Sequence, residues 1–274
     1  MTLSQIRQVC NQYDIRPAKS RGQNFLIDQN IVKKIMVVAE LGKDDVVLEV
    51  GPGLGALTRE LLLSQAKKII AVELDKKINE FLKAEFFEEK KLELVEGDIL
   101  KINLKDLELA DFKYKIVANL PYNITAQFLR LFLEHSPRPK EIIVMVQKEV
   151  AQRIIAKAGE MSVLAVAAQF FGEPKILFKV GHDCFWPEPE VDSAVIKIDL
   201  KSDLPPVDVK KFFRIVRIGF SARRKQLHNN LAAGLGLKNS QIKQFFNNFG
   251  WREDIRAQDL GVEDWIKLFE ILNF

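Results

Sequence analysis

The sequence of 274 residues predicts an α/β fold, a doubly wound and mostly parallel sheet, followed by a small helical domain. From Val46 onward, short β-branched runs alternate with amphipathic helical stretches, which is the pattern of βαβ units. A glycine-rich turn follows the first of these runs, and only helical periodicity is seen after residue 204. These three observations together favour one α/β domain with a helical appendage.

Seven stretches are expected to form the strands of the sheet. They are Val46–Val50, Lys68–Glu73, Leu92–Glu96, Lys115–Asn119, Glu141–Gln147, Lys175–Val180 and Ser193–Asp199. Apolar residues at helical spacing predict intervening helices at Leu57–Ser64, Lys76–Phe87 and Ala126–Glu134. A Pro-rich loop joins the last two strands, so we expect them to form an antiparallel hairpin at one edge of the sheet.

The segment Lys201–Pro206 interrupts this alternation, and we place a domain boundary there, giving domains of residues 1–203 and 204–274. Four helices are expected in the second domain: Val209–Gly219, Arg223–Ala233, Ser240–Phe249 and Val262–Leu272. The first 24 residues, Met1–Asn24, show no strong pattern and are expected to form a mobile arm.

Composition indicates a cytoplasmic protein that neither enters a membrane nor carries a metal. No apolar run reaches the roughly 18 residues that a membrane helix needs, and the N-terminal residues contain no apolar signal core. Cys10 and Cys184 are far apart and outside any metal-binding pattern, which excludes a disulfide framework and a zinc site. We expect a monomer.

The positive charge is concentrated in the second domain. Residues 201–274 carry 13 Lys and Arg against 8 Asp and Glu, whereas the whole chain has a net charge of +4. Such an excess suits a polyanionic partner, although an imbalance of this size is more often only a solvated surface.

The first strand ends in a turn that suits a ligand with a close approach to the backbone. Gly51, Gly53 and Gly55 follow Val50, and glycine permits a tight turn where a Cβ would clash. The spacing Gly51-x-Gly53-x-x-Ala56 also satisfies the fingerprint of dinucleotide-binding proteins. A tight strand-to-helix connection without a ligand fits the same residues.

Acidic residues at successive strand tips favour a nucleoside cofactor without a pyrophosphate. Glu73 ends the second strand, 22 residues after Gly51, where a carboxylate can accept hydrogen bonds from a ribose diol. Asp98 follows the third strand, within reach of an adenine amine. Glu49, directly before the glycine turn, would repel a pyrophosphate.

The fourth strand ends in the tetrapeptide Asn119-Leu120-Pro121-Tyr122, which suits methylation of an exocyclic amine. The Asn119 side-chain oxygen and the Leu120 carbonyl can accept hydrogen bonds from such an amine and direct its lone pair at a methyl donor. Pro121 stiffens the turn, and Tyr122 offers a ring on which an unstacked base can lie. A strand that ends in a Pro-containing turn with a buried Tyr is the alternative.

A second aromatic surface is expected from the Pro-rich loop. Phe185 precedes two prolines in Phe185-Trp-Pro-Glu-Pro189, and a stiff loop could present this ring to the other face of a base. A core Phe beneath a rigid hairpin accounts for the same residues.

Taken in order, these motifs resemble those of the ribosomal RNA adenine dimethyltransferases, and most of all the bacterial small-subunit (16S) enzymes. The resemblance rests on Gly22–Leu26, Glu49–Gly55, Val72–Asp75, Gly97–Asp98, Asn119–Tyr122, Phe185–Ser193 and Phe220–Lys225. It implies a Rossmann-like class I methyltransferase fold, S-adenosylmethionine as cofactor, and dimethylation of the N6 amines of two adjacent adenosines in small-subunit RNA during 30S assembly.

The same resemblance implies roles for particular residues. Cofactor contacts are expected at Asn24, Leu26, Gly51, Glu73, Asp98 and Asn119. Residues Gln23–Leu26 become a lid on the cofactor, with Phe25 packing nearby. Arg223, Arg224 and Lys225 open a basic helix that is expected to contact ribosomal RNA.

Three alternatives remain open at this point. Large-subunit (23S) methyltransferases that confer macrolide resistance share the cofactor and Asn-Leu-Pro-Tyr features, but Val191-Asp192-Ser193 and the Arg-Arg-Lys run are closer to the small-subunit enzymes. A non-catalytic RNA-binding assembly factor would not need intact Asn119 and Tyr122. A nicotinamide oxidoreductase fits only the glycine turn.

Overall fold

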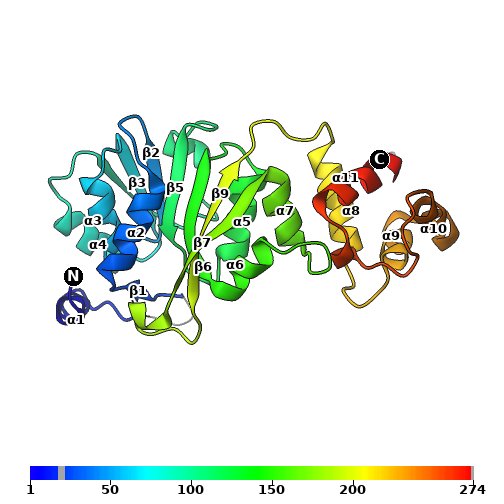
Figure 1. The fold of residues 1–274 in the computed structure, drawn as a ribbon. Helices are drawn as coiled ribbons and strands as arrows, with labels where there is room; N and C mark the ends of the chain where they lie inside the picture. Colours follow the sequence, from blue (N-terminus) through cyan, green and yellow to red (C-terminus); the bar gives the residue numbers. More distant parts are fainter. Residues whose placement is uncertain (18–21, 273–274) are drawn as a thin grey trace. The chain divides into compact units, whose positions relative to one another are not determined.

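The computed structural model describes residues 1–17 and 22–272, which form two compact units (Figure 1). The first unit comprises Met1–Ala151 with Glu173–Leu200, and the second comprises Gln152–Gly172 with Lys201–Phe274. The sequence predicted a domain boundary after residue 203, close to Leu200, where the first unit ends. It assigned residues 152–172 to the first domain, whereas the structure has them in the second unit.

Aromatic packing explains why the segment 152–172 joins the second unit. Phe170 stacks on Phe212 with ring centroids 4.7 Å apart, and Phe171 stacks on Phe213 at 5.4 Å. All four rings are at most 2% exposed. Because the partners lie far along the chain from one another, no local pattern could have shown this association.

The helices and strands alternate through most of the first unit. Its elements are α1 (Leu3–Gln12), β1 (Phe25–Leu26), α2 (Gln29–Ala39), β2 (Val46–Val50), α3 (Ala56–Leu63), β3 (Lys68–Glu73), α4 (Lys76–Glu85), β4 (Leu92–Glu96), η2 (Leu104–Leu107), β5 (Tyr114–Asn119), α5 (Thr125–Glu134), β6 (Glu141–Gln147), β7 (Gly172–Val180), η3 (His182–Cys184), β8 (Phe185–Trp186) and β9 (Ser193–Leu200). The remaining helices are α6 (Lys148–Ile154), which crosses the unit boundary, and α7 (Val163–Phe171), α8 (Val209–Gly219), α9 (Leu227–Leu235), α10 (Asn239–Asn248), η4 (Ala257–Asp259) and α11 (Val262–Leu272).

The main sheet has seven strands in the order β4-β3-β2-β5-β6-β9-β7. The strands β2 to β6 are parallel to their neighbours, whereas β9 runs antiparallel to β6, with Gln147 opposite Ser193 and Glu141 opposite Asp199. All seven predicted strands are present. The last two predicted strands are neighbours at one edge of the sheet, as expected, with β9 next to β6 and β7 outermost.

An apolar core fixes the sheet against α2 and α3, which lie beside the β2 half of the sheet in Figure 1. Val32 and Ile35 of α2 and Leu61 of α3 are at most 2% exposed and pack on the central strands. The strands β5 and β6 are buried along almost their whole length, as expected for central parallel strands covered on both faces. This packing brings the carboxyl ends of β2, β3, β4 and β5 to one edge.

The prediction that Met1–Asn24 forms a mobile arm was wrong for the residues that are described. Thr2 and Gln5 form a reciprocal capping box that starts α1. Ile6 and Cys10 of this helix are buried in a cluster with Phe81 of α4. The spacing of these two residues, which places them on one helix face, was the available signal. Residues 18–21 of the predicted arm lie outside the described part of the chain.

A second correction concerns the start of α9. Arg223, Arg224 and Lys225 were expected to open this helix, but they lie in the turn that precedes it, and α9 begins at Leu227. The Asn230 side chain donates to the carbonyl oxygens of Gly219 and Ala222, at 2.6 and 3.1 Å. These bonds satisfy carbonyl groups at the end of α8 and in the turn, and the three basic residues remain exposed.

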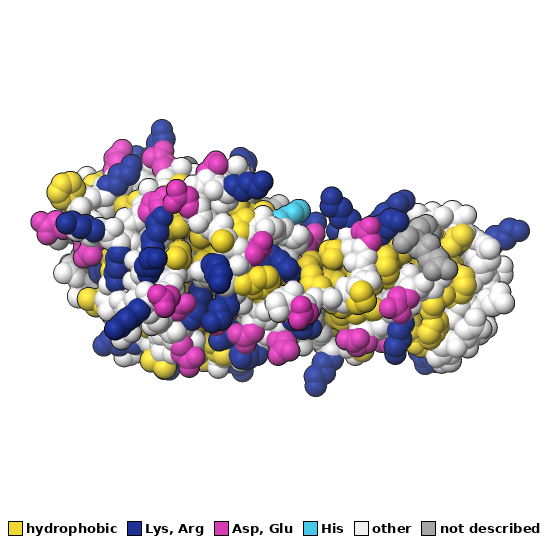
Figure 2. Space-filling view, turned by 90° about the horizontal axis from the view of Figure 1, so that it is seen from above, with side chains coloured by type: hydrophobic (Ala, Val, Ile, Leu, Met, Phe, Trp, Pro, Cys, Tyr) yellow, Lys and Arg dark blue, Asp and Glu magenta, His cyan; other side chains and the backbone are white. Residues whose placement is uncertain are grey.

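The surface mixes charges of both signs. Figure 2 shows Lys and Arg side chains next to Asp and Glu side chains over much of the face that it presents. The net charge of +4 therefore does not produce a field of one sign on this face. No helix within residues 1–17 and 22–272 is long and apolar enough to cross a membrane.

The central strand β2 carries a carboxyl group into the interior. Glu49 is 1% exposed, and its Oε2 accepts a hydrogen bond from the Thr58 hydroxyl at 2.8 Å. Burial, with a smaller contribution from the neighbouring Glu73 carboxyl, raises the pKa of Glu49 from 4.5 to about 8. At neutral pH the folded chain therefore holds a proton on Glu49.

Glu49→Gln should remove a pH dependence of stability. Between pH 4.5 and about 8 the folded state keeps the Glu49 proton that the unfolded state has lost, so the free energy of unfolding falls as the pH rises. The substituted amide still accepts from Thr58 and cannot ionise. The variant should gain relative stability across this window, on the order of 4 kcal/mol at its upper end, measured by urea unfolding at several pH values. Parallel wild-type and variant curves would contradict the assignment.

Candidate active site

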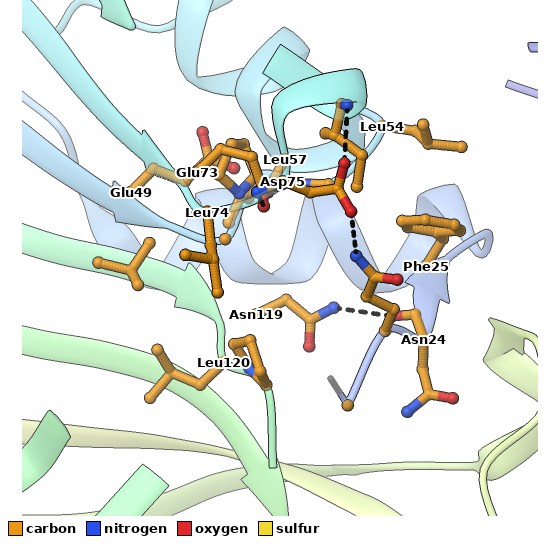
Figure 3. Close-up of a pocket in the computed structure, with 18 of the residues that line it drawn as sticks. Asn24, Phe25, Glu49, Leu54, Leu57, Glu73, Leu74, Asp75, Asn119 and Leu120 are labelled. Atoms are coloured by element: carbon orange, nitrogen blue, oxygen red, sulfur yellow. Dashed lines mark hydrogen bonds between the residues drawn. The ribbon is translucent and has the colours of Figure 1, made fainter. Parts of the chain in front are cut away.

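A cavity of about 190 Å³ opens at the carboxyl ends of β2 to β5 (Figure 3). Its wall is built from the glycine turn after β2, the acidic tips of β3 and β4, the Asn119–Tyr122 turn after β5, and the segment 22–26. In open parallel sheets, ligands bind at this edge, where the direction of the crossover connections changes. The position and the lining residues together mark it as the candidate site.

The glycine turn lets two other segments approach its backbone closely. Gly51 and Gly53 have φ values of 67° and 56°, which L-residues rarely adopt. A Cβ on Gly51 would lie 3.3 Å from Pro121, and one on Gly53 would lie 3.1 Å from the Phe25 ring. A side chain at either position would therefore push Pro121 or Phe25 away from the turn.

Glu73, at the tip of β3, is a preformed acceptor. One carboxylate oxygen accepts from the Gly53 N–H at 3.2 Å, and the other accepts from the Asp75 N–H at 3.0 Å. The side chain is 6% exposed, and burial, only partly offset by these hydrogen bonds, raises the pKa of the carboxyl group. Each oxygen retains lone pairs, so Glu73 can receive two further hydroxyl groups from a ligand in the cavity.

Asp98 also lines the cavity, at the turn after β4. Its Oδ1 accepts from the Leu100 N–H at 3.1 Å, and Lys101 lies 3.4 Å from Oδ2. The first bond fixes the carboxylate at the wall. Glu73 and Asp98 therefore lie at adjacent strand tips, as the sequence predicted.

Asn119 and Leu120 are held in place at the end of β5. The Asn119 Nδ2 donates to the Asn24 carbonyl oxygen at 3.4 Å, as Figure 3 shows, which orients the amide and leaves Oδ1 available as an acceptor. The Leu120 N–H donates to the Met145 carbonyl of β6 at 3.2 Å. Both residues line the cavity, with Pro121 and Tyr122 next to them.

Tyr122 is half-buried, with its hydroxyl 2.6 Å from Ser193 Oγ. Burial raises the pKa of the phenol, and the hydrogen bond to Ser193 only partly offsets this effect. The ring therefore stays neutral at physiological pH. A neutral aromatic ring at the cavity wall suits stacking better than proton transfer.

The segment 22–26 covers the site. Gln23 donates to Asp75 Oδ2 at 3.4 Å, which links this segment to the turn after β3. Asn24 and Leu26 both line the cavity, where the resemblance implied cofactor contacts. Phe25 lies against Gly53 and stacks on Trp186, with centroids 6.4 Å apart.

Two of the predicted groups lie elsewhere. Phe185 is not among the described residues that line the cavity; it is 3% exposed and packs in the core with Leu26 and Val180. Its backbone pairs in β8 with β1, and this pairing directs the ring inward. The structure thus favours the core alternative for Phe185. Arg223, Arg224 and Lys225 belong to the second unit.

Sequence reasoning missed several lining residues. Met1 and Ile6 line the cavity because α1 packs beside it, and Leu54 and Leu74 add apolar surface next to the acids. Two features of the sequence could have indicated them: a short helical pattern in α1, and apolar residues next to the acidic and glycine motifs. Within the described residues, no group of three or more His, Cys, Asp and Glu side chains could hold a metal ion.

Comparison with known proteins places this arrangement in a family. The sequence profile of the ribosomal RNA adenine dimethylases matches residues 16–273. A ribosomal RNA small subunit methyltransferase A of Dehalococcoides mccartyi (strain CBDB1) is 42% identical over 268 residues, covering 97% of this chain and 92% of that protein.

Solved structures show the same fold over nearly the whole chain. A dimethyladenosine transferase from Plasmodium falciparum aligns with a TM-score of 0.75 and 27% identity, covering 91% of this chain and 97% of that one. The 23S rRNA methyltransferase ErmE aligns with a TM-score of 0.70 and 25% identity, covering 92% and 100%. The fold is that of the class I methyltransferases, and the chain belongs to the ribosomal RNA adenine dimethylase family.

Proposed function

We propose that this chain transfers methyl groups from S-adenosylmethionine to the N6 amines of two adjacent adenosines in small-subunit (16S) ribosomal RNA. The observation that carries the proposal is the position of Asn119–Tyr122, which form a wall of the same cavity as Glu73 and Asp98. The acids that suit a cofactor and the acceptors that suit a substrate amine thus line the same cavity.

The residues present fit S-adenosylmethionine. Glu73 would hold the ribose hydroxyls and Asp98 the adenine amine, while Gly51, Asn24 and Leu26 would lie along the rest of the ligand. The cradle depends on glycine, because a Cβ at Gly51 would crowd Pro121 and one at Gly53 would crowd the Phe25 ring. When bound, S-adenosylmethionine supplies the sulfonium methyl group that is transferred.

The chain's own residues address the poor nucleophilicity of an adenine amine, whose lone pair is delocalised into the ring. Asn119 Oδ1 and the Leu120 carbonyl would accept the two N–H groups and draw the nitrogen toward a tetrahedral geometry. Pro121 fixes this turn, and the Tyr122 ring would support the extruded base. Positioning of this kind requires no strong base.

Identity supports the small subunit over the large one as the substrate. The Dehalococcoides small-subunit methyltransferase shares 42% of aligned residues, against 25% for the 23S enzyme ErmE. Fold similarity does not separate the two, because the P. falciparum dimethyladenosine transferase and ErmE align almost equally well.

The oligomeric state, the cellular location and the RNA-binding domain form a second part of the proposal. We infer that the chain acts as a monomer in the cytoplasm, on the assembling 30S subunit, and that the domain of residues 204–274 contacts the RNA. Arg223, Arg224 and Lys225 support this assignment because they are exposed and adjacent in one turn.

The direct test is transfer of labelled methyl from S-adenosylmethionine to small and large ribosomal subunits from a strain that lacks this protein, followed by nucleoside analysis. Dimethyladenosine in the small subunit alone is expected. Label in the large subunit would favour a 23S enzyme, and tight subunit binding without label would indicate a non-catalytic assembly factor.

Asn119→Ala should abolish most turnover, with a loss of kcat on the order of 100-fold, because an acceptor for the amine is lost. Cofactor binding should remain detectable by calorimetry, since Glu73 and Asp98 are unchanged. Turnover close to that of the wild type would remove Asn119 from the chemical step.

Glu73→Ala should weaken S-adenosylmethionine binding by about 1.5–3 kcal/mol, the usual contribution of hydrogen bonds to a charged acceptor. Glu73→Gln, which keeps one acceptor oxygen, should lose less. Calorimetric titration measures both, and an unchanged affinity in Glu73→Ala would exclude this residue from the cofactor site.

Replacing Arg223, Arg224 and Lys225 by Glu should weaken binding to small subunits. Binding should also depend less steeply on salt, because each lost phosphate contact lowers the slope of log K against log salt by roughly 0.7–0.9. Filter binding between about 50 and 200 mM salt measures this change.

A matched control reverses the same number of charges elsewhere. Lys43, Lys83 and Lys90 are exposed in the first unit and take no part in the proposed site. Their triple Glu variant should bind almost normally. Equal effects of the two triple variants would return Arg223, Arg224 and Lys225 to the role of a solvated surface.

A further inference from the structure

The hydroxyl of Tyr122 is anchored by a residue 71 positions away in sequence. Tyr122 follows β5, Ser193 begins β9, and the two oxygen atoms are 2.6 Å apart. Because β6 lies between these two strands in the sheet, the bond passes across the carboxyl end of β6. Ser193 is fully buried.

Ser193 is itself held rigidly. It pairs with Gln147 at the end of β6, and the carbonyl of the preceding Asp192 accepts the Lys148 N–H at 3.0 Å. The Asp192 carboxylate accepts the His182 N–H at 3.3 Å and lies 2.8 Å from its ring Nδ1. Both ends of the loop between His182 and Asp192 are thus joined immediately before Ser193.

We propose that Ser193 is a positioning residue for methyl transfer, which fixes the position of the Tyr122 ring beside the target adenine. This inference rests on the proposed function. A Tyr side chain has two main torsions. Because the hydroxyl oxygen lies on the long axis of the ring, anchoring it at Ser193 fixes the first torsion and with it the position and direction of that axis. A misplacement of about 1 Å is enough to reduce a transfer rate by orders of magnitude, because the amine must meet the acceptors at Asn119 and Leu120.

The bond acts through geometry and not through a proton. Burial raises the pKa of the Tyr122 phenol, so both partners are neutral hydroxyl groups near neutral pH. The pH profile of turnover should therefore keep its shape when either hydroxyl is removed, while its height falls.

The test is a double-mutant cycle with Ser193→Ala, Tyr122→Phe and the combined variant, assayed on small subunits that lack the modification. Each single variant should lower kcat about three- to tenfold, the equivalent of one neutral hydrogen bond. The KM for subunits and the affinity for S-adenosylmethionine should stay within about twofold. The combined variant should be no slower than the slower single variant, because both changes remove the same bond.

Tyr114→Phe is the matched control. Tyr114 begins the same strand, and its buried hydroxyl donates to the Pro137 carbonyl at 2.7 Å, at the opposite edge of the sheet. This variant loses a comparable hydrogen bond and should lower stability without lowering kcat. A parallel loss of kcat in Tyr114→Phe would attribute the effect to general destabilisation and overturn the inference.

The remaining outcomes separate this inference from the proposed function. An active wild type with an unchanged kcat in Ser193→Ala, or with multiplicative losses in the combined variant, overturns the role of Ser193 alone. A wild type that forms no methyladenosine overturns the proposed function and this inference with it. Tyr122→Phe removes the same bond from its half-buried end, so this variant tests the bond even where Ser193→Ala folds poorly.

Discussion

The close approach of two turns at the carboxyl edge of the sheet determines where the other groups of the site lie. Gly51, after β2, and Pro121, after β5, are so near that a Cβ on Gly51 would lie 3.3 Å from the Pro121 ring. This approach sets the acceptors at Asn119 and Leu120 beside the cradle that the glycine turn forms. The left-handed φ of 67° at Gly51 makes any other residue strained there, whatever space is available.

Charge inside the site is arranged so that two carboxyl groups can be buried near one another. Glu49 is kept neutral by burial, with its Oε2 bonded to Thr58, whereas the oxygens of Glu73 accept N–H groups from Gly53 and Asp75. A buried carboxylate without such donors would cost several kcal/mol. One acid thus avoids ionisation, while the other receives backbone hydrogen bonds that support its use as an acceptor.

Much of this could be predicted because the information is local. Periodicity predicts the seven strands. The residue types at the strand ends predict the glycine turn, Glu73, Asp98 and Asn119–Tyr122. The failed predictions for the N-terminal arm and for residues 152–172 depend on distant partners. Ile6 of α1 is buried in a cluster that includes Phe81 of α4, far along the chain. The periodicity of a sequence indicates which face of a helix is apolar, but it does not identify the distant residue that packs against that face.

The loop between β7 and β9 shows how one hairpin can serve two walls of a site. Sequence suggested that it presents Phe185 to a base, but the loop uses Phe185 and Trp186 to pair with β1, which holds Phe25 over the glycine turn. Its far end delivers Ser193 to the Tyr122 hydroxyl. A change in this loop would therefore affect two parts of the site. It would displace the segment 22–26 through β1, and it would displace the Tyr122 ring through Ser193. This one loop therefore supports both the cover at Phe25 and the position of the Tyr122 ring. None of the described residues that line the cavity comes from the loop itself.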